Sequence, residues 1–217
     1  MRAVIFDLDG VLVDSMPSHS LSWVQAFQKV AGIKIERRLL YVLEGMRGAE
    51  LVERVFLESG TDMSLAHKVV EEKDRIFKKM ERPQPFEGVK EMIRDLSCAK
   101  AVVSGSNKHD VESFLDDIAG KENFDAVITA DDVKRGKPDP LAFTTALEKL
   151  KLLASQAIVV ENAPLGAKAA ANAGIPCYVV LNSTPLSRSD FAGIIEQERI
   201  LEKTSSLKGL LEKLCRE

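Results

Sequence analysis

Two aspartates near the beginning of the sequence have the type and spacing to hold a cation. Residues 4–6 are apolar and lead directly into Asp7-Leu8-Asp9-Gly10. Side chains two positions apart on an extended segment point the same way, so we expect Asp7 and Asp9 on one face, before a turn at Gly10. Two carboxylates about 4 Å apart repel by about 4 kcal/mol at an effective dielectric of about 20. A divalent cation would relieve that repulsion, although the pair taken alone also fits a solvated turn.

Further polar residues follow two later apolar runs and one loop. Ser104 ends one run, Glu161 and Asn162 end another, and Lys137 lies in the loop 134–138. An open parallel sheet binds its ligands at the carboxyl ends of its strands. Ser104 also precedes a predicted helix, whose free N–H groups favour an anion. Each feature alone fits a helix cap or a solvated loop, but their order and spacing together indicate a site for a phosphoryl group.

These residues need a sheet to bring them together, and the chain after residue 85 has the pattern of one. Strands and helices alternate there, which is typical of a parallel sheet covered on both faces. We predict strands at 4–6, 101–103, 124–128, 157–160 and 177–181, with a short one near 199–201. The predicted helices between them cover 87–97, 107–118, a segment opened by Asp139 and Pro140, and 165–173, and the tail 190–215 is expected to be mostly helical.

The stretch between the first two predicted strands has only helical patterns. Apolar residues at helical spacing predict helices at about 17–31, 36–44, 48–59 and 64–81. Two prolines then mark a stiff linker at 82–85. We therefore expect an α/β core domain made of residues 1–15 and 83–217. A helical cap domain, residues 16–82, would be inserted between its first and second strands.

Composition excludes several classes of partner. The 217 residues carry 30 Lys and Arg against 33 Asp and Glu, a net charge of −3, so no basic field predicts nucleic-acid or membrane binding. No apolar stretch approaches the length of about 20 residues that spans a bilayer. Because the N-terminus leads at once into a predicted strand, we expect no signal peptide. Cys98, Cys177 and Cys215 are scattered and odd in number. We expect reduced thiols in a cytoplasmic protein that is a monomer or a weak homodimer.

The motifs together resemble the haloacid dehalogenase-like superfamily over essentially the whole chain. They are residues 7–15 (DLDGVLVDS), Ser104, residues 136–140 (GKPDP), and residues 161–166 (ENAPLG) through 173–176 (AGIP). The resemblance implies a Rossmann-like, doubly wound parallel sheet with an inserted α-helical bundle as a cap. The cap's position is similar to the branch that contains β-phosphoglucomutase, phosphoglycolate phosphatase and small sugar-phosphate phosphatases.

The resemblance also implies roles for four residues. Asp7 would be the nucleophile that becomes an aspartyl-phosphate, and Asp9 would protonate the leaving oxygen and then activate water. Lys137 and Ser104 would stabilise and position the phosphoryl oxygens. The residue types suit this chemistry: an aspartate is already ionised at neutral pH, and a carboxylate nucleophile divides ester hydrolysis into two displacements.

The metal set implied by the resemblance is Mg²⁺ on Asp7, Asp9, Glu161 and Asn162. Mg²⁺ suits a site made of oxygen atoms and completed by water and substrate phosphate. Asn162 departs from the pattern of the branch, which usually has Asp at this position. An amide oxygen can bind Mg²⁺ but adds no charge, so we expect Glu161 to carry more of the binding.

The predicted substrate contacts come from both domains. From the core they are Ser104, Gly105, Asn107 and Lys137, and from the cap they are His19, Gly45 and Arg47. His19 matches a position of the mutase-like branch that helps to place Asp9, although it also fits a polar residue on the first turn of a helix.

Phosphatase is the favoured activity over mutase. A mutase needs a second phosphate site on the cap, yet Glu44 and Gly48 stand where β-phosphoglucomutase carries basic residues. Arg47 and Lys73 remain as candidates for such a site. Two other classes stay open: a catalytically inactive phosphate-binding protein, because of Asn162, and a phosphoacceptor signalling domain, which needs only about half this length and no cap.

Overall fold

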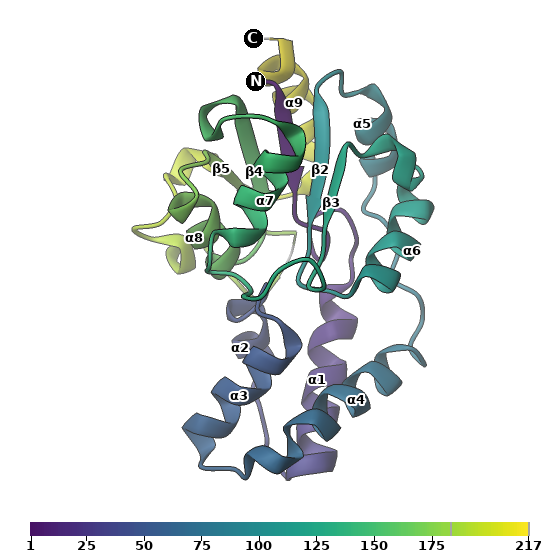
Figure 1. Cartoon of the computed structure of the whole chain (residues 1–217), viewed down its shortest axis with the longest axis vertical. Helices are drawn as coiled ribbons and strands as arrows, with labels where there is room; N and C mark the ends of the chain where they lie inside the picture. Colours follow the sequence, from purple (N-terminus) through teal and green to yellow (C-terminus); the bar gives the residue numbers. More distant parts are fainter. Residues whose placement is uncertain (183, 217) are drawn as a thin grey trace.

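The computed structural model describes residues 1–182 and 184–216, and its centre is a six-stranded, wholly parallel sheet (Figure 1). The strand order is β3-β2-β1-β4-β5-β6. The strands are β1 Ala3–Phe6, β2 Ala99–Val103, β3 Ala126–Ile128, β4 Ala157–Glu161, β5 Cys177–Val180 and β6 Ile200–Leu201. This order confirms the predicted doubly wound α/β fold. It also puts the carboxyl ends of β1, β2 and β4 next to one another.

Helices cover both faces of the sheet, and the strand pattern explains why. All four residues of β1 are buried, with Ala3 and Ile5 in one core cluster and Val4 and Phe6 in another. The first cluster packs under α7 (Leu141–Leu150) and α8 (Pro164–Asn172). The second packs under α5 (Val89–Asp95), α6 (Lys108–Ile118) and α9 (Leu207–Arg216). Continuous apolar strands are what a sheet buried on both faces requires.

Of the five α-helices between β1 and β2 in the sequence, the first four gather at the lower end of the molecule (Figure 1). They are α1 Met16–Ala31, α2 Arg37–Val42, α3 Gly48–Ser59 and α4 Ala66–Phe77. Their apolar faces form a separate core around Trp23, Phe27 and Phe56. We call these four helices and their connections the helical bundle. The domain boundaries at 15/16 and 82/83 remain a prediction.

The chain crosses between bundle and sheet twice, and the two crossings lie side by side. Asp14 donates its backbone N–H to Gln84 at 2.9 Å, and Phe86 donates to Leu12 at 3.0 Å. These bonds hold the end of the first motif against the Pro-rich linker. Any movement of the bundle relative to the sheet would therefore bend the chain at these two connecting segments.

The tail differs from the expected helix. Residues 188–206 contain three short 3₁₀ turns and β6, and only α9 is an α-helix. The apolar residues in this region are too irregularly spaced for one continuous helix, and Phe191 and Ile200 instead pack on one face of the sheet. Within the described residues, no helix is long and apolar enough to cross a membrane.

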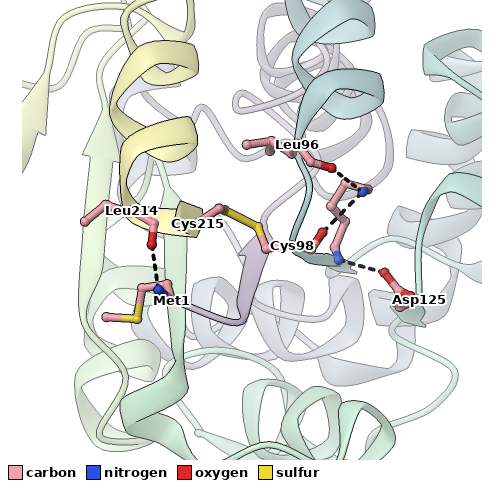
Figure 2. The surroundings of a disulfide bond; sticks show 7 residues. Met1, Leu96, Cys98, Asp125, Leu214 and Cys215 are labelled. Atoms are coloured by element: carbon pink, nitrogen blue, oxygen red, sulfur yellow. Dashed lines mark hydrogen bonds between the residues drawn. A yellow bond between two sulfur atoms is a disulfide. The ribbon is translucent and has the colours of Figure 1, made fainter. Parts of the chain in front are cut away.

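Two of the three cysteines form a disulfide, so the expectation of reduced thiols is wrong for them. Cys98 and Cys215 are bonded, with their Cα atoms 5.5 Å apart, and they join the residue before β2 to α9 (Figure 2). The N-terminal amine of Met1 donates to the carbonyl of Leu214 beside this bond at 2.5 Å. Cys177 is a free, buried thiol. Disulfides persist in oxidising surroundings, so the cysteines no longer support a reducing compartment.

Removing this disulfide is expected to lower stability without lowering activity. The bond closes a loop of 117 residues, and the loop-entropy estimate for that length is about 5 kcal/mol. Cys98 precedes the amino end of β2, whereas the predicted site lies at the carboxyl ends of the strands. Urea unfolding of Cys98→Ser should therefore show a lower free energy of unfolding, with unchanged phosphate release in buffer. Equal stability of variant and wild type would contradict this.

Candidate active site

Three charged side chains from separate elements meet at the end of the sheet. Lys137, which is 3% exposed, donates from Nζ to Oδ1 of Asp7 at 2.5 Å and also to Oε1 of Glu161. Asp7 follows β1, Glu161 ends β4, and Lys137 lies between β3 and α7. The parallel topology thus brings together residues that are 130 and 24 positions apart in the sequence. A buried lysine shared by two carboxylates can neutralise further negative charge, such as a phosphoryl group.

The ionisation of these groups follows from burial and from their neighbours. Burial raises the pKa of Asp7, and Glu161 and Asp9 add to that effect, so the pKa lies well above its usual range although Lys137 opposes it. Burial alone would lower the pKa of Lys137, but Asp7 and Glu161 outweigh it and raise the pKa above its ordinary value. Lys137 is therefore a permanent positive charge at the floor of the site.

Asp9 is held by four hydrogen-bond donors. Oδ1 accepts from Ser15 Oγ at 2.6 Å and lies 3.1 Å from His19 Nε2, and Oδ2 accepts from Ser104 Oγ at 3.1 Å and Ser106 Oγ at 3.0 Å. Burial would raise the pKa of Asp9, but His19 and the hydroxyl groups hold it well below its usual range. Asp9 is therefore a carboxylate in this arrangement and can accept a proton.

Two of these donors were not among the predicted site residues. Ser15 closes the first motif, and Ser106 comes two positions after Ser104. A serine is so common at turns and helix starts that its type alone gave no signal. Only the fold shows that both hydroxyls face the same carboxylate. His19, in contrast, lies beside Asp9 where the sequence analysis expected it.

Three of the predicted substrate contacts from the core lie in the loop after β2, and each has different neighbours. Ser104 is buried and accepts a hydrogen bond from the backbone N–H of Ser106 at 3.0 Å. Asn107 is exposed and caps α6, since its Oδ1 accepts from the N–H of Asp110 at 3.0 Å. A Cβ on Gly105 would lie 3.3 Å from the carbonyl oxygen of Gly45. Gly105 therefore lets the helical bundle approach the sheet, while the contact made by Asn107 is a helix cap.

The connection between α2 and α3, residues 43–47, is docked on the loop that carries Lys137. The carbonyl of Gly45 accepts from the backbone N–H of Lys137 at 3.1 Å. A Cβ on Gly45, whose φ is +90°, would lie 2.6 Å from Cδ of Lys137, so this position requires glycine. Arg47 donates from Nη1 to the carbonyl of Lys134 at 3.0 Å. Glu50 accepts from the N–H of Gly136 at 3.1 Å. We call residues 43–47 the α2–α3 loop.

A cavity of about 230 Å³ lies between the helical bundle and these strand ends. Its lining includes Asp7 and Asp9 from the core and Trp23, Glu44 and Lys73 from the bundle. The ammonium of Lys73 lies 5.5 Å from the centre of the Trp23 ring. The cavity thus combines an aromatic wall with charges of both signs, which suits a small polar molecule. Arg47 and Lys73, the two predicted cap cations, both line the cavity. Arg47 donates from Nη1 to the Lys134 carbonyl and has a buried Nε without a partner among the described residues, whereas Lys73 lies 3.3 Å from Oδ1 of Asp74.

Buried oxygen atoms test whether Mg²⁺ fits this site. Within the described residues, Asp7 Oδ2, Asn162 Oδ1 and Glu44 Oε1 are buried and have no hydrogen-bond donor. Both oxygens of Glu161 are engaged, Oε1 by Lys137 and Oε2 by the N–H groups of Asn162 and Ala163. The described residues form no cluster of three or more His, Cys, Asp or Glu suited to a metal. The fit therefore depends on carboxylate and amide oxygens, which are donors that Mg²⁺ accepts.

Sequence and structure comparisons agree on one family. The model for haloacid dehalogenase-like hydrolases matches residues 4–180. A phosphorylated carbohydrates phosphatase of Thermotoga maritima is 28% identical over 212 residues, which cover 93% of this chain and 97% of that protein. A validoxylamine A 7′-phosphate phosphatase of Streptomyces hygroscopicus subsp. limoneus is 32% identical over 181 residues, covering 81% of this chain and 84% of that protein. Among solved structures, a candidate beta-phosphoglucomutase from Bacteroides vulgatus superposes with a TM-score of 0.87 at 29% identity, covering 100% of this chain and 91% of that one.

Proposed function

The chain belongs to the haloacid dehalogenase-like hydrolases and is a phosphatase of that family, and we propose that it hydrolyses a small sugar phosphate or similar monoester with Mg²⁺. The membership confirms the resemblance seen in the motifs. The observation that carries the proposal is the buried contact of Lys137 with Asp7. It joins a nucleophile to a fixed positive charge at the edge of a cavity sized for a small metabolite.

In the first step, Asp7 attacks phosphorus in its ionised form, which Lys137 favours against the effect of burial, and the bond to the leaving oxygen breaks. Asp9 takes up a proton from solvent as the substrate displaces its contacts with His19 and the serines, and it gives this proton to the leaving oxygen. Lys137 offsets the charge on the phosphoryl group. In the second step, water attacks the phosphorus of the aspartyl-phosphate and transfers a proton to Asp9. Phosphate leaves, and Asp9 is protonated again for the next cycle. We expect Asp9 to exchange contacts with His19 and the serines for the substrate oxygen during the first step.

Mg²⁺, when bound, would add positive charge at the phosphoryl oxygens. The unpaired oxygens of Asp7 and Asn162 support its placement there, whereas Glu161 has both oxygens hydrogen-bonded. The predicted role of Asp9 as a ligand remains part of this proposal. Dialysis against a chelator should abolish phosphate release, and added Mg²⁺ should restore it.

The His19→Ala variant is expected to lose about tenfold in kcat, because a group that orients a catalytic carboxylate contributes on that scale. Loss of the 3.1 Å contact also raises the pKa of Asp9. Asp9 must be ionised to take a proton from water in the second step. Where that step limits kcat, the acidic limb of the pH profile of kcat should therefore move to higher pH. His67→Ala is the control, because that histidine lies on α4 with its side chain 82% exposed. An unchanged kcat and acidic limb in His19→Ala would exclude the positioning role.

A substrate panel tests the proposed function. Sugar phosphates, phosphoglycolate, nucleotides and p-nitrophenyl phosphate are incubated with the protein, with and without Mg²⁺, and released phosphate is measured. We expect Mg²⁺-dependent release, fastest with a sugar phosphate. Absence of release from every ester at several Mg²⁺ concentrations would contradict the proposal and favour a binding role.

A mutase remains the second candidate because Arg47 and Lys73 provide cations from the helical bundle on the cavity wall. The residues Glu44 and Gly48 argue against it, since neither offers positive charge to a second phosphate. Conversion of β-glucose 1-phosphate to glucose 6-phosphate faster than phosphate release would favour the mutase.

A further inference from the structure

Glu44 extends from the helical bundle to the residue after β4. Asn162 donates from Nδ2 to Oε2 of Glu44 at 2.8 Å, across 118 positions of sequence. Glu44 belongs to the α2–α3 loop, which lies at the junction of the bundle and the sheet (Figure 1). The contact therefore links the two parts of the molecule inside the proposed site.

This hydrogen bond fixes the direction of the Asn162 amide. The end of the amide that faces Glu44 is the NH₂ group, since Nδ2 donates to Oε2. The oxygen, Oδ1, then points elsewhere and has no donor, although Asn162 is only 1% exposed. A Cβ on Gly10 would lie 2.1 Å from Nδ2, so the first motif packs tightly against the amide in this orientation.

The charges around the amide are unevenly distributed between core and bundle. The core supplies three carboxylates, Asp7, Asp9 and Glu161, against Lys137, and Asn162 adds no charge. Glu44 supplies one more carboxyl group from the bundle, with Oε1 buried and without a donor among the described residues. Burial and the nearby Asp7, Glu161 and Asp9 raise the pKa of Glu44, so a cation beside it would favour its ionised form. Three unpaired oxygens, on Asp7, Asn162 and Glu44, thus come from three segments of the chain. Carboxylate and amide oxygens of this kind are ligands that Mg²⁺ accepts.

We propose that Glu44 completes the Mg²⁺ site from the helical bundle, by orienting the Asn162 amide and by supplying the carboxylate charge that Asn162 lacks. The inference rests on the proposed Mg²⁺-dependent function and deepens it. Glu44 reaches Asn162 only while the α2–α3 loop is docked on the sheet. Metal binding and docking of the bundle are therefore coupled, and each stabilises the other.

The α2–α3 loop has other contacts with the core, so the role of the Glu44 charge can be tested separately. The bonds from Lys137 to Gly45 at 3.1 Å and from Gly136 to Glu50 at 3.1 Å do not involve Glu44. In Glu44→Gln, the amide oxygen can still accept from Asn162, so the variant removes charge and keeps the contact. Glu53→Gln is the matched control, because Glu53 is an exposed carboxylate on α3.

The test is the affinity for Mg²⁺ measured by calorimetry without substrate. We expect Glu44→Gln to bind Mg²⁺ at least about tenfold more weakly than wild type, and Glu53→Gln to bind as wild type does. The double variant Glu44→Gln/Asn162→Asp returns the charge to the core and should recover affinity to within about threefold of wild type. Circular dichroism confirms folding of each variant.

Fluorescence of Trp23, the only tryptophan in the sequence, reports the coupling to docking. A Cβ on Gly48, the first residue after the α2–α3 loop, would lie 3.4 Å from the Trp23 ring. Mg²⁺ should change this fluorescence in wild type, and about tenfold more Mg²⁺ should be needed in Glu44→Gln.

The outcomes separate this inference from the proposed function. Equal Mg²⁺ affinity of wild type and Glu44→Gln overturns the inference and leaves the phosphatase proposal standing. Failure of the double variant to recover affinity overturns the charge role of Glu44. Absence of Mg²⁺ binding by wild type overturns the inference and the metal part of the proposed function together.

Discussion

Asp7→Asn is expected to abolish phosphate release, with kcat lower by about 10⁴-fold or more, as for other enzymes that lose their nucleophile. The side-chain amide of asparagine cannot form the aspartyl-phosphate that the carboxylate of Asp7 would form. Phosphate release from the best ester of the panel measures the effect.

The fold should survive this substitution. Asp7 shares Lys137 with Glu161, so the lysine keeps a carboxylate partner in the variant. Burial and nearby carboxylates already disfavour the charged form of Asp7 by raising its pKa. Asp116→Asn, an exposed position on α6, controls for loss of a carboxylate. Turnover of Asp7→Asn above a tenth of wild type would remove Asp7 as the nucleophile.

Lys137→Met is the second substitution with a large expected effect. Removing one preorganised donor to a developing negative charge costs about 10²–10³ in kcat in other enzymes. The Lys137 side chain is 3% exposed and donates to both Asp7 and Glu161. Among the described residues, no other cation contacts these two carboxylates and could replace its positive charge. We expect a loss of kcat in this range for every ester that wild type hydrolyses.

The same substitution should also lower stability. Breaking a buried ion pair by removing one partner costs about 3–5 kcal/mol, because the remaining charges are left uncompensated. Urea unfolding measures this change, and phosphate release measures the change in kcat. Lys134→Met is the control, since Lys134 is exposed in the same loop. A variant at Lys137 with wild-type turnover would contradict the assignment of its charge to the phosphoryl group.

Much of the fold was predictable because its elements have local causes. Buried parallel strands are short apolar runs, and β1, β2 and β4 were expected within two residues of their observed ends. The helices predicted at 17–31 and 48–59 end where expected, because a glycine follows each of them: Gly32 and Gly60 adopt left-handed φ values of 69° and 66°. The tail lacked such periodicity, and its 3₁₀ turns were mistaken for helix.

The site was predictable where a motif fixes a residue at a strand end. Asp7, Lys137 and Glu161 were expected together because parallel strands end at one edge of the sheet. Contacts that depend on how distant side chains pack were not predictable. The disulfide spans 117 residues, and Glu44 reaches Asn162 from a loop whose position depends on bundle packing.

Localisation of the covalent phosphoryl group tests the central claim most directly. The Asp9→Asn variant should still form the acyl-phosphate but hydrolyse it slowly, because no carboxylate remains to activate water. The variant is mixed with p-nitrophenyl phosphate and Mg²⁺, quenched in acid and digested, and its peptides are identified by mass spectrometry. We predict a single phosphoryl group on Asp7. A phosphoryl group on another residue would contradict the account. So would the absence of any phosphoryl group in Asp9→Asn if the wild-type protein hydrolyses the same ester.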